Sequence, residues 1–132
     1  MANRLKMAIV QSILSLHSQG WSARRIAKAP LETYLASIVE ATADWEGTTS
    51  SNYTGYDKMV AKLRAENLET QVASGSAWIG SPAEIRAQIQ SRLDDFGPFE
   101  HASMQVNFGT LPPDEALRSL ELFAKEVLPA FT

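Results

Sequence analysis

The stretch GSAWIGSPAEI, at residues 75–85, carries the strongest local signal in the chain. Its first half is short, apolar and bounded by glycine, which favours a strand over residues 76–79. Ser81 followed by Glu84 forms a capping box, with proline at the first helical position. Apolar side chains then recur every four residues, at Ile85, Ile89 and Leu93. The stretch therefore predicts a strand that runs directly into an amphipathic helix.

A second unit of the same kind lies near the C-terminal end. Residues 102–108 alternate between apolar and polar side chains, which is the periodicity of a strand. Pro112-Pro113 then opens a helix, whose apolar stripe consists of Leu117, Leu120, Phe123, Val127 and Leu128. Two strand–helix units in succession predict a parallel α/β arrangement. We expect the strands at 76–79 and 102–108 to be parallel neighbours, each followed by a helix on the same side.

The N-terminal residues show a different pattern. Apolar side chains spaced by three or four predict an amphipathic helix over about residues 5–18. Gly20 would end this helix, Ser22 would cap a second short helix over residues 23–29, and Pro30 would close the segment. Helix, glycine turn and short helix are typical of the opening of a helix-turn-helix. Two further helices are predicted, at about residues 31–45 and 56–67.

The net charge of −3 is unevenly distributed along the 132 residues. Residues 1–29 carry five basic residues and no acid (+5), residues 30–132 carry seven basic residues and 15 acids (7 − 15 = −8), and the two balances sum to −3. A basic segment favours contact with nucleic acid, and a solvated basic helix face explains it equally well. Arg24, Arg25 and Lys28 are the candidates for contacts with a DNA backbone.

The composition limits the kinds of functional site and of cellular location that we expect for the chain. The chain contains no cysteine, which excludes disulfides and thiolate metal sites, and its two histidines are too few and too far apart for a zinc site. No apolar run approaches the roughly 20 residues that span a bilayer. The basic N-terminal residues are not followed by the apolar region of a signal peptide. We therefore expect a cytoplasmic protein with no metal and no membrane contact.

The stretch at residues 75–85 resembles the luciferase-like flavin-dependent monooxygenases, in which a strand runs into a Gly-Ser-Pro turn and a helix. The resemblance continues through Phe99-Glu100-His101 and through QVNFG at 105–109. It ends in SLELFAKEVLP at 119–129, which looks like the C-terminal helix of that family. It covers about residues 30–132, and the order and spacing of the segments make it more specific than any single one.

This resemblance implies that residues 30–132 are the last two β/α units of a (β/α)8 TIM barrel, preceded by a short helical segment at residues 1–29. Members of the family use reduced FMN and oxygen, or related flavin chemistry, so FMN is the cofactor of the parent family. The catalytic positions of the family lie upstream, and no catalytic residue is assigned here. Because a barrel pocket is built from the loops after many strands, we expect the isolated chain to be inactive and to bind no FMN tightly.

Residues 1–29 resemble the start of insertion-sequence transposases that work with a separate ATPase helper. The resemblance rests on MANRLKMA at 1–8, Gly20-Trp21-Ser22 and Arg24-Arg25-Ile26-Ala27. It implies a truncated DNA-binding helix-turn-helix, since LETY at 31–34 does not resemble a recognition helix. The alternative function is therefore a truncated transposase-type DNA-binding protein. Its binding would be weak and non-specific, because no recognition helix is left to read bases.

Three residues are candidates for cofactor binding. Gly80 and Ser81 open a helix at the end of a barrel strand, where free N–H groups and the helix dipole favour an anion such as phosphate. An ordinary capped helix start explains the same two residues. Asn107 would lie at the mouth of the barrel, where it could contact flavin or substrate, and polar filling of the barrel explains it as well. As a third hypothesis, the chain is an interaction protein that self-associates through exposed strand edges.

Overall fold

The computed structural model describes residues 10–16, 20–45, 47, 52 and 54–132. In chain order the elements are β1 (Val10–Leu16), α1 (Gly20–Ala41), the 3-10 turn η1 (Ala43–Trp45), α2 (Tyr56–Ala65), α3 (Leu68–Ser74), β2 (Ala77–Gly80), α4 (Pro82–Phe96), β3 (Ala102–Gln105), α5 (Pro113–Leu122), the π-helical turn η2 (Phe123–Val127) and the 3-10 turn η3 (Leu128–Ala130). Among these elements, no helix combines the length and the apolar character needed to cross a membrane.

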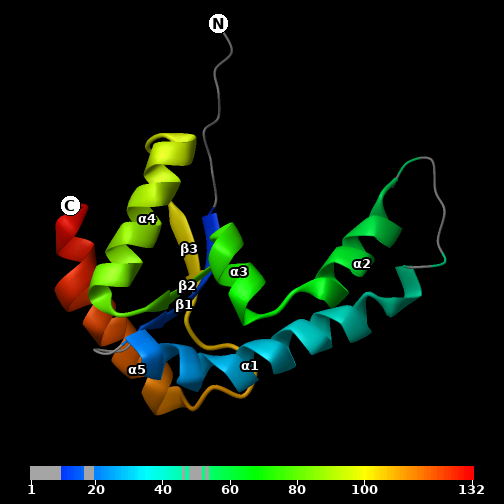
Figure 1. The fold of residues 1–132 in the computed structure, drawn as a ribbon, viewed down its shortest axis with the longest axis horizontal. Coiled ribbons are helices and arrows are strands. Elements are labelled where there is room, and N and C mark those ends of the chain that lie inside the picture. The colour runs from blue at the N-terminus through cyan, green and yellow to red at the C-terminus, as the bar shows by residue number, and fades with distance from the viewer. Residues whose placement is uncertain (1–9, 17–19, 46, 48–51, 53) are drawn as a thin grey trace, which may run out of the picture.

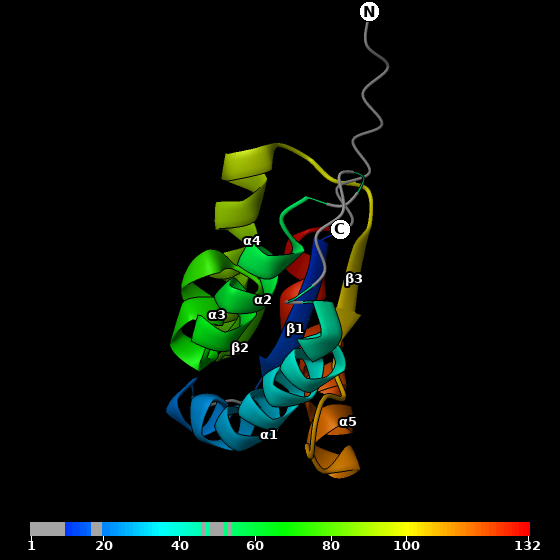
Figure 2. The ribbon, with the colours of Figure 1, turned by 90° about the vertical axis from the view of Figure 1, so that its right-hand side faces the viewer.

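The three strands form one parallel sheet in the order β2-β1-β3 (Figure 2). Leu14 lies opposite Trp78 on one side of β1, and Ser12 lies opposite Met104 on the other. The strands at β2 and β3 are therefore parallel, as predicted, but they are not neighbours, because β1 lies between them. The described strands make an open, all-parallel sheet in an α/β arrangement.

The predicted helix over residues 5–18 is wrong for residues 10–16, which form the central strand of the sheet. The remaining residues of that prediction lie outside the described part of the chain. A short apolar run is compatible with either a helix or a strand, and long-range pairing decides between them. Here β1 has a parallel partner on each side, and its Leu14 side chain is fully buried.

The predicted break at Pro30 is also absent, because α1 continues through this residue. A proline inside a helix removes the hydrogen bond to the carbonyl four residues earlier, here that of Ile26. The helix persists because one of its faces is buried at every fourth residue, by Ala23, Ala27, Leu31 and Leu35. The structure thus shows no boundary between elements at residues 29 and 30. The division of the chain into a segment at 1–29 and a segment at 30–132 remains a prediction.

The two strand–helix units near the C-terminal end are confirmed. Strand β2 leads into α4, whose capping box has both reciprocal hydrogen bonds, between Ser81 and Glu84. Strand β3 ends at Gln105, three residues earlier than predicted, and residues 106–112 connect it to α5. Phe108 therefore does not continue the alternation of the strand, and its buried side chain joins a different apolar cluster from that of Met104.

Two apolar clusters lie on opposite faces of the sheet. On one face Leu14 and Trp78 pack against Ile85 and Ile89 of α4 and against η2, which extends α5; that cluster also includes Phe123 and Val127. The two C-terminal helices thus pack on the same side, as predicted (Figure 1). Arg86 of α4 donates a hydrogen bond to the Glu126 carbonyl at 2.7 Å and links the two helices further.

The other cluster joins α1 and α3 to the sheet and to the segment that follows β3. Ala77 and Ile79 of β2 pack there with the buried face of α1, with Leu68 of α3 and with Phe108 and Leu111. Beyond this cluster, the C-terminal half of α1 and helix α2 extend away from the sheet as an arm (Figure 1). The strands point toward α1, which crosses the lower end of the sheet in Figures 1 and 2.

Gly109 fixes the close approach of the β3–α5 segment to α1, and its replacement by alanine should destabilise the fold. Its φ is +54°, and a Cβ atom at this position would overlap with the carbonyl oxygen of Pro30. The left-handed backbone and the overlap together should lower the free energy of unfolding by about 2–4 kcal/mol, measured by chemical denaturation. Gly55→Ala has a positive φ but open surroundings, and Gly47→Ala has neither constraint. A loss for Gly109→Ala no larger than that for Gly55→Ala would contradict the close approach.

Candidate functional site

The carboxyl ends of the three strands lie at one edge of the sheet, which is where α/β proteins hold their ligands. Gly80, the last residue of β2, lies opposite Leu16, the last residue of β1. Asn107 follows the end of β3 by two residues. The structure thus brings Gly80, Ser81 and Asn107 to the same edge. Because β1 separates β2 from β3, the backbones of these two strands are about 10 Å apart across the sheet, twice the spacing of neighbouring strands.

The N-terminus of α4, predicted as an anion site, is occupied by a carboxylate of the chain itself. The Ser81 backbone N–H donates to Glu84 Oε2 at 2.7 Å, and the Glu84 N–H donates to Ser81 Oγ at 3.4 Å. The same Glu84 oxygen would lie 2.6 Å from a Cβ atom added to Gly80. A phosphate at this helix end would therefore have to displace the Glu84 carboxylate and replace its hydrogen bond.

The carboxyl edge is covered by α1. The Ile79 side chain, one residue before the end of β2, is buried in the same cluster as Ala27 and Leu31 of α1. Phe108, which follows Asn107, is buried there as well, whereas Asn107 itself is exposed. The apolar face of α1 thus fills the region where a ligand of the sheet would lie, and Asn107 remains at the rim.

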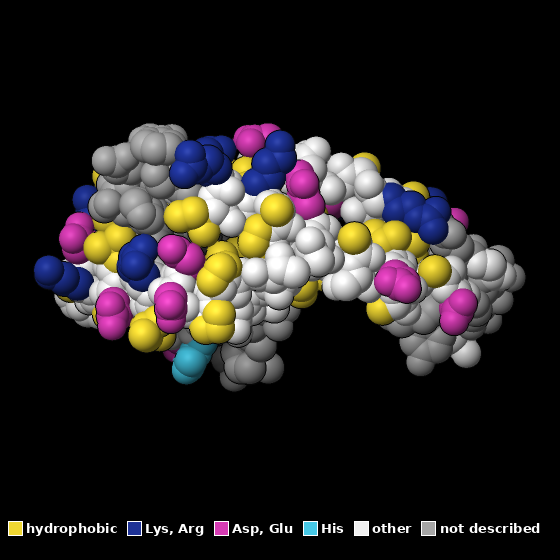
Figure 3. All heavy atoms as spheres, turned by 90° about the horizontal axis from the view of Figure 1, so that it is seen from below, with side chains coloured by type: hydrophobic (Ala, Val, Ile, Leu, Met, Phe, Trp, Pro, Cys, Tyr) yellow, Lys and Arg dark blue, Asp and Glu magenta, His cyan; other side chains and the backbone are white. Residues whose placement is uncertain are grey.

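The three basic residues predicted to contact DNA all lie on α1. Arg24 forms an ion pair with Glu69 of α3, with Nη1 and Oε2 3.2 Å apart, and both side chains are partly exposed to solvent. Arg25 and Lys28 are exposed. Figure 3 views the molecule from below, where α1 and α5 lie, and shows basic, acidic and hydrophobic side chains interspersed. The described residues do not form the two-helix geometry of a helix-turn-helix, because β1 stands where its first helix was predicted.

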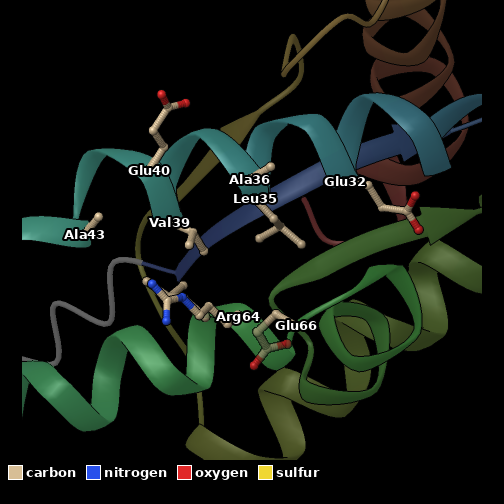
Figure 4. A pocket seen from close by; sticks show the side chains of 9 residues that line it. Glu32, Leu35, Ala36, Val39, Glu40, Ala43, Arg64 and Glu66 are labelled. Carbon is tan, nitrogen blue, oxygen red and sulfur yellow. The ribbon is translucent and has the colours of Figure 1, made fainter. Parts of the chain in front are cut away.

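A pocket of about 420 Å³ lies between the arm helices α1 and α2, and sequence patterns did not indicate it. Its lining consists of Glu32, Leu35, Ala36, Val39, Glu40, Ala43, Leu63, Arg64 and Glu66. In Figure 4, Arg64 extends from α2 toward Val39 of α1, whereas Glu40 points away. The pocket combines residues about 30 positions apart in sequence, and the helical spacing of Leu35 and Val39 predicts only that these two share a helix face.

Glu66, at the C-terminal end of α2, is held in place by two hydrogen bonds. Thr70 Oγ1 donates to its Oε2 at 2.5 Å and Gln71 Nε2 donates to the same atom at 2.9 Å. These two bonds, that from Thr70 first, and the nearby charge of Lys62 lower the pKa of Glu66, against a smaller opposing effect of burial. The carboxylate is therefore kept ionised at one wall of the pocket.

Three further ionisable side chains lie at the surface of the described chain. His101, Asp94 and Asp95 are exposed, and Asp94 accepts a hydrogen bond from Gln90 at 2.9 Å. Trp78 is buried in the core with 1% of its surface exposed. In the described part of the chain, no three His, Cys, Asp or Glu side chains are placed to hold a metal ion.

The stability that Glu66 contributes should depend on pH in a defined direction. Because its folded pKa lies below the ordinary value of 4.5, the contribution is present above that value and is lost as the pH falls through the folded pKa. The melting temperature of Glu66→Gln should therefore fall less on acidification than that of the parent chain. Glu40→Gln, which alters another carboxylate of the same pocket, is the control and should follow the parent. Equal slopes for Glu66→Gln and the parent would refute this.

DNA binding by this chain should be weak, sensitive to salt and indifferent to sequence. Arg25 and Lys28 are exposed on α1, but the acidic remainder of the chain opposes the approach of DNA. In a gel shift at two salt concentrations, Arg25→Ala combined with Lys28→Ala should abolish the residual binding. Lys58→Ala combined with Lys62→Ala, on α2, is the matched control. Binding that distinguishes one duplex sequence from random DNA at physiological salt would be the contrary result.

Comparison with known proteins supports the α/β fold class. No protein-family model matches the chain, and no curated protein matches it. The crystal structure of the monooxygenase RslO1 from Streptomyces bottropensis is similar, with a TM-score of 0.63 and 24% sequence identity over 92% of this chain. Residues 30–132 are 103 of 132 residues, or 78%, so the similarity extends into residues 1–29. This chain covers 30% of the RslO1 chain, and it therefore has the fold of part of a monooxygenase.

Proposed function

We propose that this chain corresponds to the C-terminal part of a luciferase-like flavin-dependent monooxygenase, and that it neither turns over substrate nor binds FMN tightly by itself. The observation that supports this proposal is the likeness of its fold to 30% of the RslO1 monooxygenase chain. The residues that carry the sequence resemblance lie in β2 and the start of α4, on either side of β3, and in the segment from α5 to η3. The parent chemistry would be oxidation by oxygen through reduced FMN.

The packing at the carboxyl ends of the strands supports the part of the proposal that concerns FMN, namely that the chain does not bind it tightly by itself. A flavin needs a concave pocket that buries most of its surface, with a few polar groups converging on it. Here Ile79 and Phe108 pack against α1 at this edge. Three strands supply few of the loops from which a barrel pocket is built. Access for an isoalloxazine ring would require α1 to move and would expose its buried apolar face.

The N-terminus of α4 at Ser81 also supports the absence of tight FMN binding. In a flavin site, free N–H groups there would take the FMN phosphate. In this chain the Ser81 and Glu84 N–H groups are bonded within the capping box, and the Glu84 carboxylate would repel a phosphate. Gly80, Ser81 and Asn107 remain the residues to alter if flavin binding is found.

The alternative is a truncated transposase-type DNA-binding protein, with Arg24, Arg25 and Lys28 as its contacts. The observation in its favour is that Arg25 and Lys28 are exposed on one helix, α1. The ion pair of Arg24 with Glu69 would have to break, or be shared, for Arg24 to contact a phosphate. The flavin proposal is preferred because the fold similarity concerns a monooxygenase.

Titration of FMN with the purified chain, followed by quenching of flavin fluorescence, tests the proposal. We expect no saturation in the low micromolar range, because the edge is closed and the helix end is self-capped. Asn107→Ala and the matched surface variant Asn52→Ala should behave alike. Saturable, stoichiometric binding that Asn107→Ala weakens and Asn52→Ala leaves unchanged would overturn the proposal.

A further inference from the structure

The pocket between the arm helices α1 and α2 has the size of a binding site for a small organic molecule. Its volume of about 420 Å³ falls within the range of known ligand pockets, about 300–1,000 Å³. On α1 its lining begins at Glu32, whereas Ala27 and Leu31 pack over the carboxyl ends of the strands. The pocket is therefore separate from the edge of the sheet that the flavin proposal concerns.

One side of the pocket is lined by apolar side chains of α1. Leu35 and Val39 are four residues apart and Ala36 precedes Val39 by three, so all three lie on one face of the helix. Leu35 is buried and Val39 is partly buried. Leu63 of α2, also partly buried, adds an apolar side chain to the same lining. A hydrocarbon chain placed here leaves water, which favours its binding.

Glu66 adds a carboxylate whose position is fixed before any ligand arrives. Its Oε2 accepts hydrogen bonds from Thr70 Oγ1 and Gln71 Nε2, and these bonds lower its pKa. Among the residues that the structure describes, no hydrogen-bond donor reaches its Oε1, so this oxygen remains to accept a bond from a ligand. A charged group that is already held in place loses little conformational freedom when a ligand binds.

The charges of the lining favour a cationic ligand. The lining contains three carboxylates and one guanidinium, those of Glu32, Glu40, Glu66 and Arg64. In Figure 4, Glu66 lies across the pocket from Leu35, and Glu40 points away from it. No ion pair between described residues involves the Glu66 carboxylate. A ligand with a positive charge next to an apolar body therefore complements the pocket.

We propose that this pocket binds a small aliphatic amine, with the ammonium group at Glu66 and the hydrocarbon chain against Leu35, Val39 and Leu63. A primary amine is protonated at neutral pH and has three N–H donors, one of which would bond to Glu66 Oε1. A hydrogen bond between charged groups is about twice as strong as one between neutral groups. An alcohol of the same length lacks this charge, and a carboxylate is repelled by the acidic lining.

Titration of n-hexylamine into the isotope-labelled full chain, followed by the amide shifts in NMR spectra, tests the proposal. We expect saturable shifts at residues 36–43 and 63–66, with a dissociation constant on the order of 1 mM for so small a ligand. n-Hexanol and hexanoate, which have the same chain length, should bind about tenfold more weakly or not at all. Shifts that do not saturate, or that are equal for the three compounds, would contradict the site.

Glu66→Gln tests the charge of the site. Glutamine keeps an oxygen that accepts from Thr70 and Gln71 but carries no charge, so the affinity for n-hexylamine should fall about tenfold. Glu40→Gln removes a carboxylate of the same lining that points away from the pocket (Figure 4), and it should change the affinity by less than about twofold. Equal losses in the two variants would show that no particular carboxylate holds the ammonium group, which is contrary to the proposal.

Ala36→Leu tests the shape of the site. The larger side chain would occupy the space of the ligand's hydrocarbon chain, so saturable binding should be lost. Ala41→Leu, exposed on α1 but outside the lining, is the matched control and should bind as the parent does. Leucine is a good helix former, so circular dichroism should show an unchanged helix content in both variants. Binding that survives Ala36→Leu would place the ligand elsewhere and overturn the proposal. These readouts do not involve flavin, so they stand apart from the FMN titration.

Discussion

Parallel pairing of β1 with a strand on each side is the interaction on which the rest of the structure depends. Leu14 of this strand packs against Trp78 of β2, and both side chains face α4 and η2. Without β1, strands β2 and β3 would have no hydrogen-bonded partner among the described elements. Three paired strands with helices on both faces approach the minimum for an independently stable sheet.

The position of α1 follows from this central strand and decides what the sheet can bind. Because α1 follows β1 after a short connection, it begins at the carboxyl end of the sheet. Its buried face then meets Ile79 and Phe108 at the edge where ligands of α/β folds bind. The contact of Gly109 with Pro30 holds the segment after β3 against the same helix. The edge of the sheet at which ligands of α/β folds bind is here occupied by side chains of the hydrophobic core.

Local sequence signals predicted the C-terminal half well and the N-terminal half poorly. The capping box at Ser81 and the alternation through Met104 are decided by neighbours in sequence, and the structure has the corresponding helix and strand. The strand at Val10–Leu16 was missed because its partners are more than 60 residues away. Pro30 was read as a helix end because the cost of proline is local, whereas the burial that offsets it is tertiary. The pocket beside Glu66 was missed for the same reason.

The order of the strands in the sheet has a consequence for the folding of the protein during its synthesis on the ribosome. Val10 pairs with Ala102, 92 residues later, and Ile13 pairs with Ala77, 64 residues later. The central strand is thus synthesised before both of its neighbours and stays unpaired until they have been made. Closure of such long loops slows folding, and an unpaired apolar strand is prone to bind other chains meanwhile. Among the three described strands, β1 therefore remains unpaired for the longest time during synthesis.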